Sequence, residues 1–227
     1  LSDIKSVAVA GSDIAVSDKI KSLGVTLDKR LTFDTQVGNL CKAVHYHARS
    51  LRHIRNSLPD SLALTVASSI VSRLDYCNSL LTGTSQKNIA RLQRAQNTVA
   101  RAVTRTAKFD HITPVLMDLH WLPVECRIKF KVATMVYKIR QTNQPAYLTP
   151  MIQEKAASRT LRSSRDHYLL VVPRRRLVTG MQAFSYAAPF IWNSLPDAIR
   201  QLDPKTVSLL TFKKQLKTHL FRLAYTI

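Results

Sequence analysis

The chain has 227 residues, long enough for one large domain or two small ones with a real hydrophobic core. Its 34 Lys and Arg outnumber 14 Asp and Glu, which gives a formal net charge of +20. Hydrophobic residues at 45% exclude a largely disordered chain, and no apolar run approaches the roughly 18 residues of a membrane span. The cationic excess favours a polyanionic partner, nucleic acid before an anionic membrane surface, although a merely soluble basic surface would have the same composition.

Glycine and proline are scarce, with five and nine residues, which favours long helices over many short strands. The chain starts at Leu1 without a signal-like segment, so we expect it to be part of a longer protein. Its cysteines are too widely spaced for a disulfide framework or a zinc site, and they indicate reduced thiols in an intracellular protein. They are Cys41, Cys77 and Cys126.

Residues 4–33 consist of short apolar pieces typical of strands. Two of these pieces, 22–27 and 31–33, are separated by the polar residues 28–30, which predicts a hairpin with its turn there. Gly24, inside the first predicted strand, indicates a bulge or the close approach of another backbone. Packing explains this glycine as well as function does.

Two helices are predicted next. The first ends at Leu58-Pro59, and its non-core faces are basic; His45 and His47 point in different directions, so a solvated basic face explains them better than a metal site. The second helix covers 60–81 with Asp60 as its N-cap, and its few charges predict that it is the most buried. The further basic residues of the first helix are Lys42, Arg49, Arg52, His53 and Arg55.

A third predicted helix begins at Ser85 and has one apolar side, from Ile89 to Val103. Five cations project from the opposite side, and at about 100° per residue they fall in one narrow stripe. A stripe of cations suits the line of negative charge along a phosphate backbone. A simply solvated face is the alternative. The five cations are Lys87, Arg91, Arg94, Arg101 and Arg105.

Two more helices are predicted before residue 142, one opened by Thr113-Pro114 and one opened by Pro123. Trp121, between them, could stack on a base, but its leucine neighbours favour a core position. The composition then changes. Residues 143–182 form a basic, proline-containing connection with one predicted strand, 168–172, flanked by arginine clusters that could grip phosphate, serve as a nuclear import signal or form a tether.

Several motifs resemble LINE-type reverse transcriptases of the jockey-like and related branches. Leu23 to Asp28, followed by Leu31 to Phe33, resembles the end of the palm, where that family has a hairpin that contributes the primer grip. The other matching motifs follow in family order and, together, cover nearly the whole chain. They are the segments 72–81, 92–97, 109–116, 119–123, 161–163, 192–196 and 211–213.

The sequence patterns and the resemblance together predict a mainly α fold in four parts. Residues 1–33 would be the end of the palm with its hairpin, and 34–142 a basic, helical, thumb-like domain. Residues 143–182 would be the basic connection with one short strand, and 183–227 a helical extension, which makes the C-terminal part α+β. In polymerases of this kind, thumb helices lie along the primer–template duplex.

The chain also departs from the family pattern. Polymerisation needs two metal ions held by palm carboxylates in an aromatic-Ala-Asp-Asp strand, and the sequence contains no Asp-Asp pair. The endonuclease, the fingers and the terminal zinc knuckle of some relatives are absent too. We therefore predict no catalytic residue, no metal and no cofactor in this chain, with magnesium expected in the missing palm of a parent RNA-directed DNA polymerase.

The predicted function is that of a non-catalytic C-terminal fragment, which grips template RNA or an RNA–DNA duplex during target-primed reverse transcription. Its partners would be RNA, DNA and the missing palm, fingers and endonuclease, in a ribonucleoprotein of the nucleus and cytoplasm. The alternative is a host-retained module that binds nucleic acid or protein without enzymatic activity. The predicted contacts are Lys21, Leu23, Gly24, Lys87, Arg91, Arg94, Arg101, Arg105, Arg162, Arg174, Arg175 and Arg176.

Overall fold

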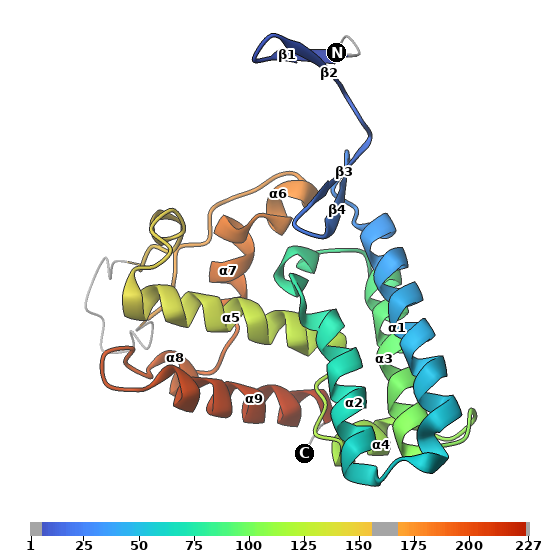
Figure 1. The fold of residues 1–227 in the computed structure, drawn as a ribbon. Coiled ribbons are helices and arrows are strands. Elements are labelled where there is room, and N and C mark those ends of the chain that lie inside the picture. The colour runs from blue at the N-terminus through green and yellow to red at the C-terminus, as the bar shows by residue number, and fades with distance from the viewer. Residues whose placement is uncertain (1–5, 156–167, 226–227) are drawn as a thin grey trace.

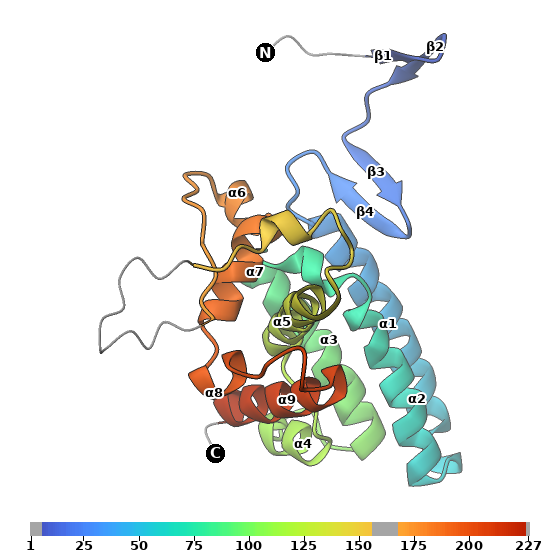
Figure 2. The same cartoon turned by 90° about the vertical axis from the view of Figure 1, so that its left-hand side faces the viewer.

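The computed structural model describes residues 6–155 and 168–225, and these are mainly helical, with two small antiparallel hairpins (Figures 1 and 2). The expected fold class is confirmed at that level. The elements are β1 (Ser6–Val9), β2 (Ser12–Ala15), β3 (Lys19–Ser22), β4 (Val25–Asp28), α1 (Asp34–Ile54), η1 (Arg55–Ser57), α2 (Asp60–Ser72), η2 (Arg73–Asp75), η3 (Asn78–Leu81), α3 (Gln86–Thr104), α4 (Ile112–Asp118), α5 (Val124–Thr142), η4 (Thr149–Met151), α6 (Val178–Gln182), α7 (Phe184–Asn193), α8 (Asp197–Arg200) and α9 (Leu209–Tyr225).

The second hairpin lies earlier in the chain than predicted. Strand β3 pairs with β4, and the turn between them is Leu23-Gly24, with φ angles of 46° and 81°. Two successive positive φ values are typical of the tight turns that match strand twist, so Gly24 is a turn residue and not a bulge. A turn does follow at 28–30, where the N–H of Leu31 donates to the carbonyl of Asp28 at 2.9 Å, but the hairpin predicted around it is wrong because Asp28 ends β4. Its carboxylate accepts hydrogen bonds from the backbone N–H groups of Thr32 (3.0 Å) and Phe33 (2.8 Å), which anchors the approach to α1.

The first hydrophobic cluster contains residues of α1, α2, α3 and α4 and of the start of α5. Helices α1 and α3 lie side by side and run in the same direction: Asn88 contacts Asp34 at one end, and Arg55 contacts Val103 at the other. Ser85 caps α3 as predicted, accepting from the N–H of Asn88 at 3.3 Å. Trp121 is 9% exposed in this cluster, which confirms its core position.

The predicted helix 60–81 is broken. Helix α2 ends at Ser72, two 3₁₀ turns follow, and Cys77 between them has a φ of 52°. The expectation that this segment is the most buried is also wrong, since Leu62 and Leu64 on α2 are exposed. Low charge predicted burial, but only one side of α2 packs on α1 and α3, and its other side is exposed.

Some predicted helix starts shift by one residue. Asp60 is the first residue of α2 and not its cap, because its carboxylate is paired with Arg55. Helix α4 begins at Ile112, before Thr113-Pro114, and α5 begins after Pro123 instead of at it. Such shifts do not change which faces are buried.

The second hydrophobic cluster brings α5 together with α7, α8 and α9. Tyr137 of α5 stacks on Phe212 of α9, with ring centroids 4.0 Å apart. Helix α5 thus lies between the two clusters and contributes to both. The domain boundaries implied by the family resemblance stay a prediction.

The strand predicted at 168–172 is reduced to a single bridge between Glu154 and Leu170. The side chain of Asn193 takes the place of a neighbouring strand: it accepts from the N–H of Leu170 at 2.9 Å and donates to its carbonyl at 2.8 Å. Trp192, fully buried, donates to the carbonyl of Tyr168 at 2.9 Å. The segment 192–196 therefore ties the connection to the second cluster.

Within 6–155 and 168–225, no helix is both long and apolar enough to cross a bilayer.

Candidate nucleic-acid interface

The C-terminal half of α3 and the end of α1 form a cationic hollow of about 810 Å³. Arg94, Arg101 and Arg105 come from the predicted stripe on α3, or from its C-terminal cap. None of the described side chains that line the hollow is acidic. The other lining residues are the cations Arg52, Arg55 and Lys108, the polar residues Asn56, Asn97, Thr98 and Thr106, and Ala102.

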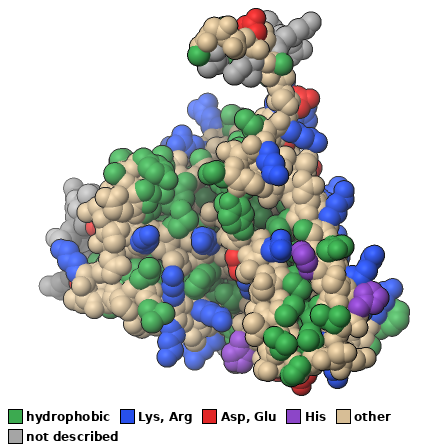
Figure 3. Space-filling view, viewed as in Figure 1, with side chains coloured by type: hydrophobic (Ala, Val, Ile, Leu, Met, Phe, Trp, Pro, Cys, Tyr) green, Lys and Arg blue, Asp and Glu red, His purple; other side chains and the backbone are tan. Residues whose placement is uncertain are grey.

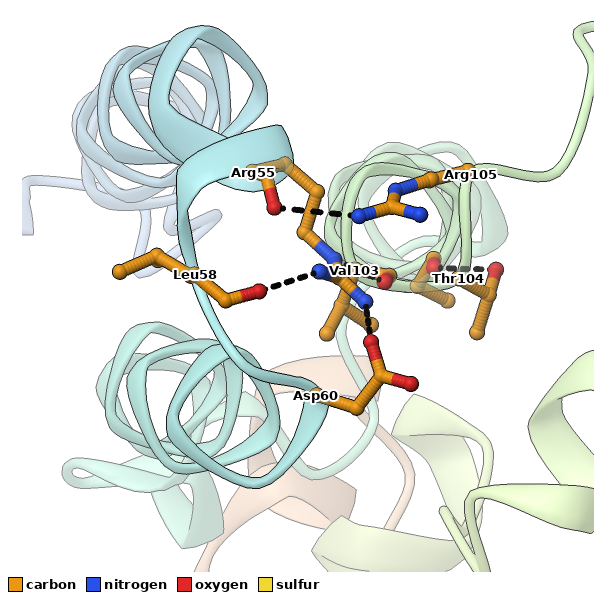
Figure 4. A network of polar contacts seen from close by, with 7 residues as sticks. Arg55, Leu58, Asp60, Val103, Thr104 and Arg105 are labelled. Atoms are coloured by element: carbon orange, nitrogen blue, oxygen red, sulfur yellow. Dashed lines mark hydrogen bonds and ion pairs between the residues drawn. The ribbon is translucent and has the colours of Figure 1, made fainter.

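Arg55 is the structural centre of the hollow and is only 6% exposed (Figure 4). Its Nε donates to the carbonyl of Val103 at 2.6 Å, and its Nη1 donates to the carbonyl of Leu58 at 3.1 Å. Its Nη2 forms an ion pair with the carboxylate of Asp60. The expected solvated position is therefore wrong for Arg55: this side chain joins the end of α1, the start of α2 and the end of α3.

The two arginines at the end of α3 also have intramolecular partners. Arg101 donates to the carbonyls of Ala107 and Asp110, the latter at 2.6 Å, so it organises the loop that follows α3. Arg105 ends the helix with a φ of 59° and donates to the carbonyl of Arg55 at 3.4 Å. Their charge reaches the hollow, but part of their hydrogen-bonding capacity is already used.

Besides Lys108, which lies over the ring of Phe109, the hollow has two cations without a partner among the described residues, Arg94 and Arg52. Both are exposed, and within the described part of the chain neither side chain forms a hydrogen bond or ion pair. Arg94 does lie close enough to Cys41 to act on it: burial raises the pKa of that thiol, and the nearby Arg91 and Arg94 oppose the rise. Two unpaired guanidinium groups across a hollow can each bind an anionic oxygen in a bidentate manner.

The rest of the predicted stripe lies outside the hollow. Arg91 is half-buried and donates to Asn88 Oδ1 at 3.3 Å and to the carbonyl of Asp34 at 3.4 Å. A Cβ at Gly38 would stand 3.1 Å from Arg91, so the glycine makes room for this side chain. Lys87 is exposed in the first turn of α3. Of the five stripe residues, Arg94, Arg101 and Arg105 therefore line the hollow, whereas Lys87 and Arg91 do not.

The hairpin residues also lie apart from the hollow, beyond the first turn of α1 (Figure 1). Leu23 is 87% exposed at the tip, where Tyr76 donates to its carbonyl at 2.7 Å. Lys21 is exposed on β3, and Gly24 completes the turn. This tip is therefore held by the segment after α2, a contact that no local pattern predicted.

Of the C-terminal arginines, Arg162 lies outside the described residues, and Arg174 to Arg176 are exposed on the segment before α6. Arg175 donates to Ser185 Oγ at 3.4 Å. None of these three lines the hollow.

Sequence reasoning missed Arg52, which it assigned to a solvated face, and Lys108. Their position near the ends of α1 and α3 was the available signal.

No protein-family model, curated protein or solved structure that was compared with this chain matches it. The resemblance to LINE-type reverse transcriptases therefore rests on the sequence motifs alone. Among residues 6–155 and 168–225, no group of three or more His, Cys, Asp or Glu side chains could hold a metal ion. The magnesium that the resemblance implies for the palm has no ligand set among these residues.

Proposed function

We propose that this chain is the non-catalytic C-terminal portion of a LINE-type reverse transcriptase, and that the hollow between α1 and α3 holds the phosphate backbone of template RNA or an RNA–DNA duplex. The observation that carries the nucleic-acid part is the lining of the hollow, which contains several cations and no acid among the described residues. The ordered motifs support the family part. Catalysis and magnesium would belong to the palm, in a ribonucleoprotein of the nucleus and cytoplasm.

Phosphate contacts position a nucleic acid without reading its sequence. The lining suits this role, because exposed Arg52 and Arg94 offer donors while the buried network around Arg55 keeps the two helix ends in place. Asn97 and Thr98 add neutral polar groups, which also contact phosphate and sugar oxygens in such interfaces. Binding should therefore be strongly salt-dependent and largely independent of sequence.

The test compares two double variants of the whole chain. Arg52→Ala/Arg94→Ala removes the two unpaired arginines of the hollow and leaves Lys108 together with Arg55 and Arg101, which hold local structure. Lys138→Ala/Lys214→Ala removes the same charge from exposed positions of α5 and α9 that do not line the hollow. Affinity for double-stranded DNA, single-stranded RNA and an RNA–DNA hybrid is measured as a function of salt.

Loss of two phosphate contacts should reduce the slope of log affinity against log salt by about 1.8 on duplex DNA and about 1.4 on a single strand. The control variant should keep a slope close to that of the wild type. Equal changes in both variants would show that only net charge matters, and the proposed hollow would then not be the binding site. The affinities for the three probes show whether the chain prefers single-stranded RNA, double-stranded DNA or the RNA–DNA hybrid.

A further inference from the structure

A second hollow, of about 410 Å³, lies between the α2–η3 segment, the start of α5 and α9, and the space-filling view shows the surface depressed between α5 and α2 (Figure 3). Its volume falls in the range of small-molecule sites, about 300–1,000 Å³. It shares no lining residue with the cationic hollow between α1 and α3. A ligand in the second hollow would therefore contact other residues than the phosphate backbone proposed for the cationic hollow.

The lining of this hollow includes a buried side-chain amide whose oxygen has no hydrogen-bond donor among the described residues. Asn78 is 2% exposed, and its Oδ1 accepts no hydrogen bond from any described residue. Its Nδ2 is directed to Asp75 Oδ1 at 3.4 Å, and Asp75 is in turn held by Arg127 from α5. A buried acceptor without a donor costs free energy, so this oxygen favours a ligand that brings an N–H group.

The remaining lining combines aromatic walls with cations. Trp121 and Phe130 line the hollow beside the amide. Lys131 of α5 and Lys217 of α9 are exposed at the same hollow, and neither is paired with an acid in the described ranges. Flat aromatic walls can pack against a heterocyclic ring, and ammonium groups can donate hydrogen bonds to a phosphate.

We propose that this second hollow binds a nucleoside 5′-monophosphate group whose base carries an amino group, as adenine does. The base would lie against Phe130, with the largely buried Trp121 forming only part of the wall, and donate its amino N–H to Asn78 Oδ1. The phosphate would be bound by Lys131 and Lys217. The group can come from a free mononucleotide or from the 5′-terminal nucleotide of a strand, because the same contacts recognise both.

The ligand side is tested by calorimetry on the whole chain with adenosine 5′-monophosphate. Saturable binding of one molecule per chain is expected. Purine riboside 5′-monophosphate, which lacks the amino group, should bind about tenfold more weakly, because it cannot donate the hydrogen bond to Asn78 Oδ1. Adenosine, which lacks the phosphate, should lose at least a similar factor. This comparison probes Asn78 without changing a buried residue.

The contribution of the protein is tested with Lys131→Ala/Lys217→Ala, which should lower the affinity for the nucleotide about tenfold or more. The matched control Lys138→Ala/Lys214→Ala removes one lysine from each of the same helices, outside the hollow, and should bind like the wild type. Arg52→Ala/Arg94→Ala should also leave this affinity unchanged. These variants distinguish a failure of the proposed phosphate binding in the cationic hollow from a failure of the proposed nucleotide binding in the second hollow.

A 5′-phosphorylated oligoadenylate and its dephosphorylated form distinguish the two sources. Preference for the phosphorylated strand that is lost in Lys131→Ala/Lys217→Ala, without binding of the free mononucleotide, assigns the hollow to a strand end. Saturable binding of the free nucleotide assigns it to a small ligand. The proposal is overturned if neither probe binds saturably, or if the control variant loses as much affinity as the lysine pair at the hollow.

Discussion

Arg127 on α5 and Asp75 after α2 form a two-point ion pair that connects segments 52 residues apart. Arg127 Nε lies 2.8 Å from Asp75 Oδ1, and its Nη2 contacts Oδ2. The two side chains are 18% and 39% exposed, so the pair is partly shielded from solvent. It joins the helix shared by both hydrophobic clusters to the 3₁₀ turns beside the second hollow.

A double-mutant cycle measures this coupling. We expect Asp75→Ala and Arg127→Ala to destabilise the chain non-additively, with an interaction energy of about 0.5–3 kcal/mol. The free energy of unfolding of both single variants and the double variant is obtained by urea titration. Strictly additive losses would show that the two-point contact adds no stability. Lys131→Ala, one turn further along α5, is a control without an ionic partner in the described chain.

Arg55→Ala should destabilise the chain by about 2–4 kcal/mol, because it leaves two backbone carbonyls without their donor and opens a cavity between three elements. Those carbonyls belong to Leu58 and Val103. Arg49→Ala, at an exposed position of α1, should change stability by less than about 0.5 kcal/mol. Thermal and urea unfolding of both variants give the comparison. A loss no larger than that of the control would contradict the structural role of Arg55.

The carboxylate of Asp28 predicts an acid-dependent loss of stability. Partial burial would raise the pKa of Asp28, but the hydrogen bonds from Thr32 and Phe33 together outweigh it and lower the pKa below the ordinary value of 3.8. A lowered folded-state pKa contributes stability that is present above 3.8 and is lost as the pH falls through the folded value.

Asp28→Asn should therefore be less stable than the wild type at pH 7, and the difference should shrink toward zero well below pH 3.8, where the wild-type carboxyl is protonated too. The measurement is the unfolding midpoint of both proteins across that range. A difference that is independent of pH would mean that the charge of Asp28 does not matter. Asp13→Asn, in the separate first hairpin, serves as the control.

Asn193→Ala removes both hydrogen bonds that hold the backbone of Leu170, a residue that is 1% exposed. The buried N–H and carbonyl groups then lack partners, and we expect a loss of about 1–3 kcal/mol. Protease cleavage between α5 and α7 should also become faster, because the amide clamp ties this connection to the second cluster. Gln215→Ala, exposed on α9, should change neither stability nor cleavage.

Local features of the sequence determined the main helices of this protein. Sequence patterns placed the helices α1, α3 and α5, and Ser85 marked the start of α3, because amphipathicity and capping depend only on neighbours within a few turns. Net charge and the stripe on α3 likewise indicated a cationic surface. These properties need no knowledge of distant residues.

Tertiary structure alone decided which of those cations remain free. Arg55 is held in a buried position by a hydrogen bond that its Nε donates to a carbonyl 48 residues away, and Arg101 is engaged by the loop after its own helix. The same holds for the break at Cys77 and for Asn78, a buried residue in the lining of a hollow built from helices far apart in the chain. Hydrogen-bond partners at such separations leave no periodic trace in the sequence, so only the packed arrangement separates binding groups from structural ones.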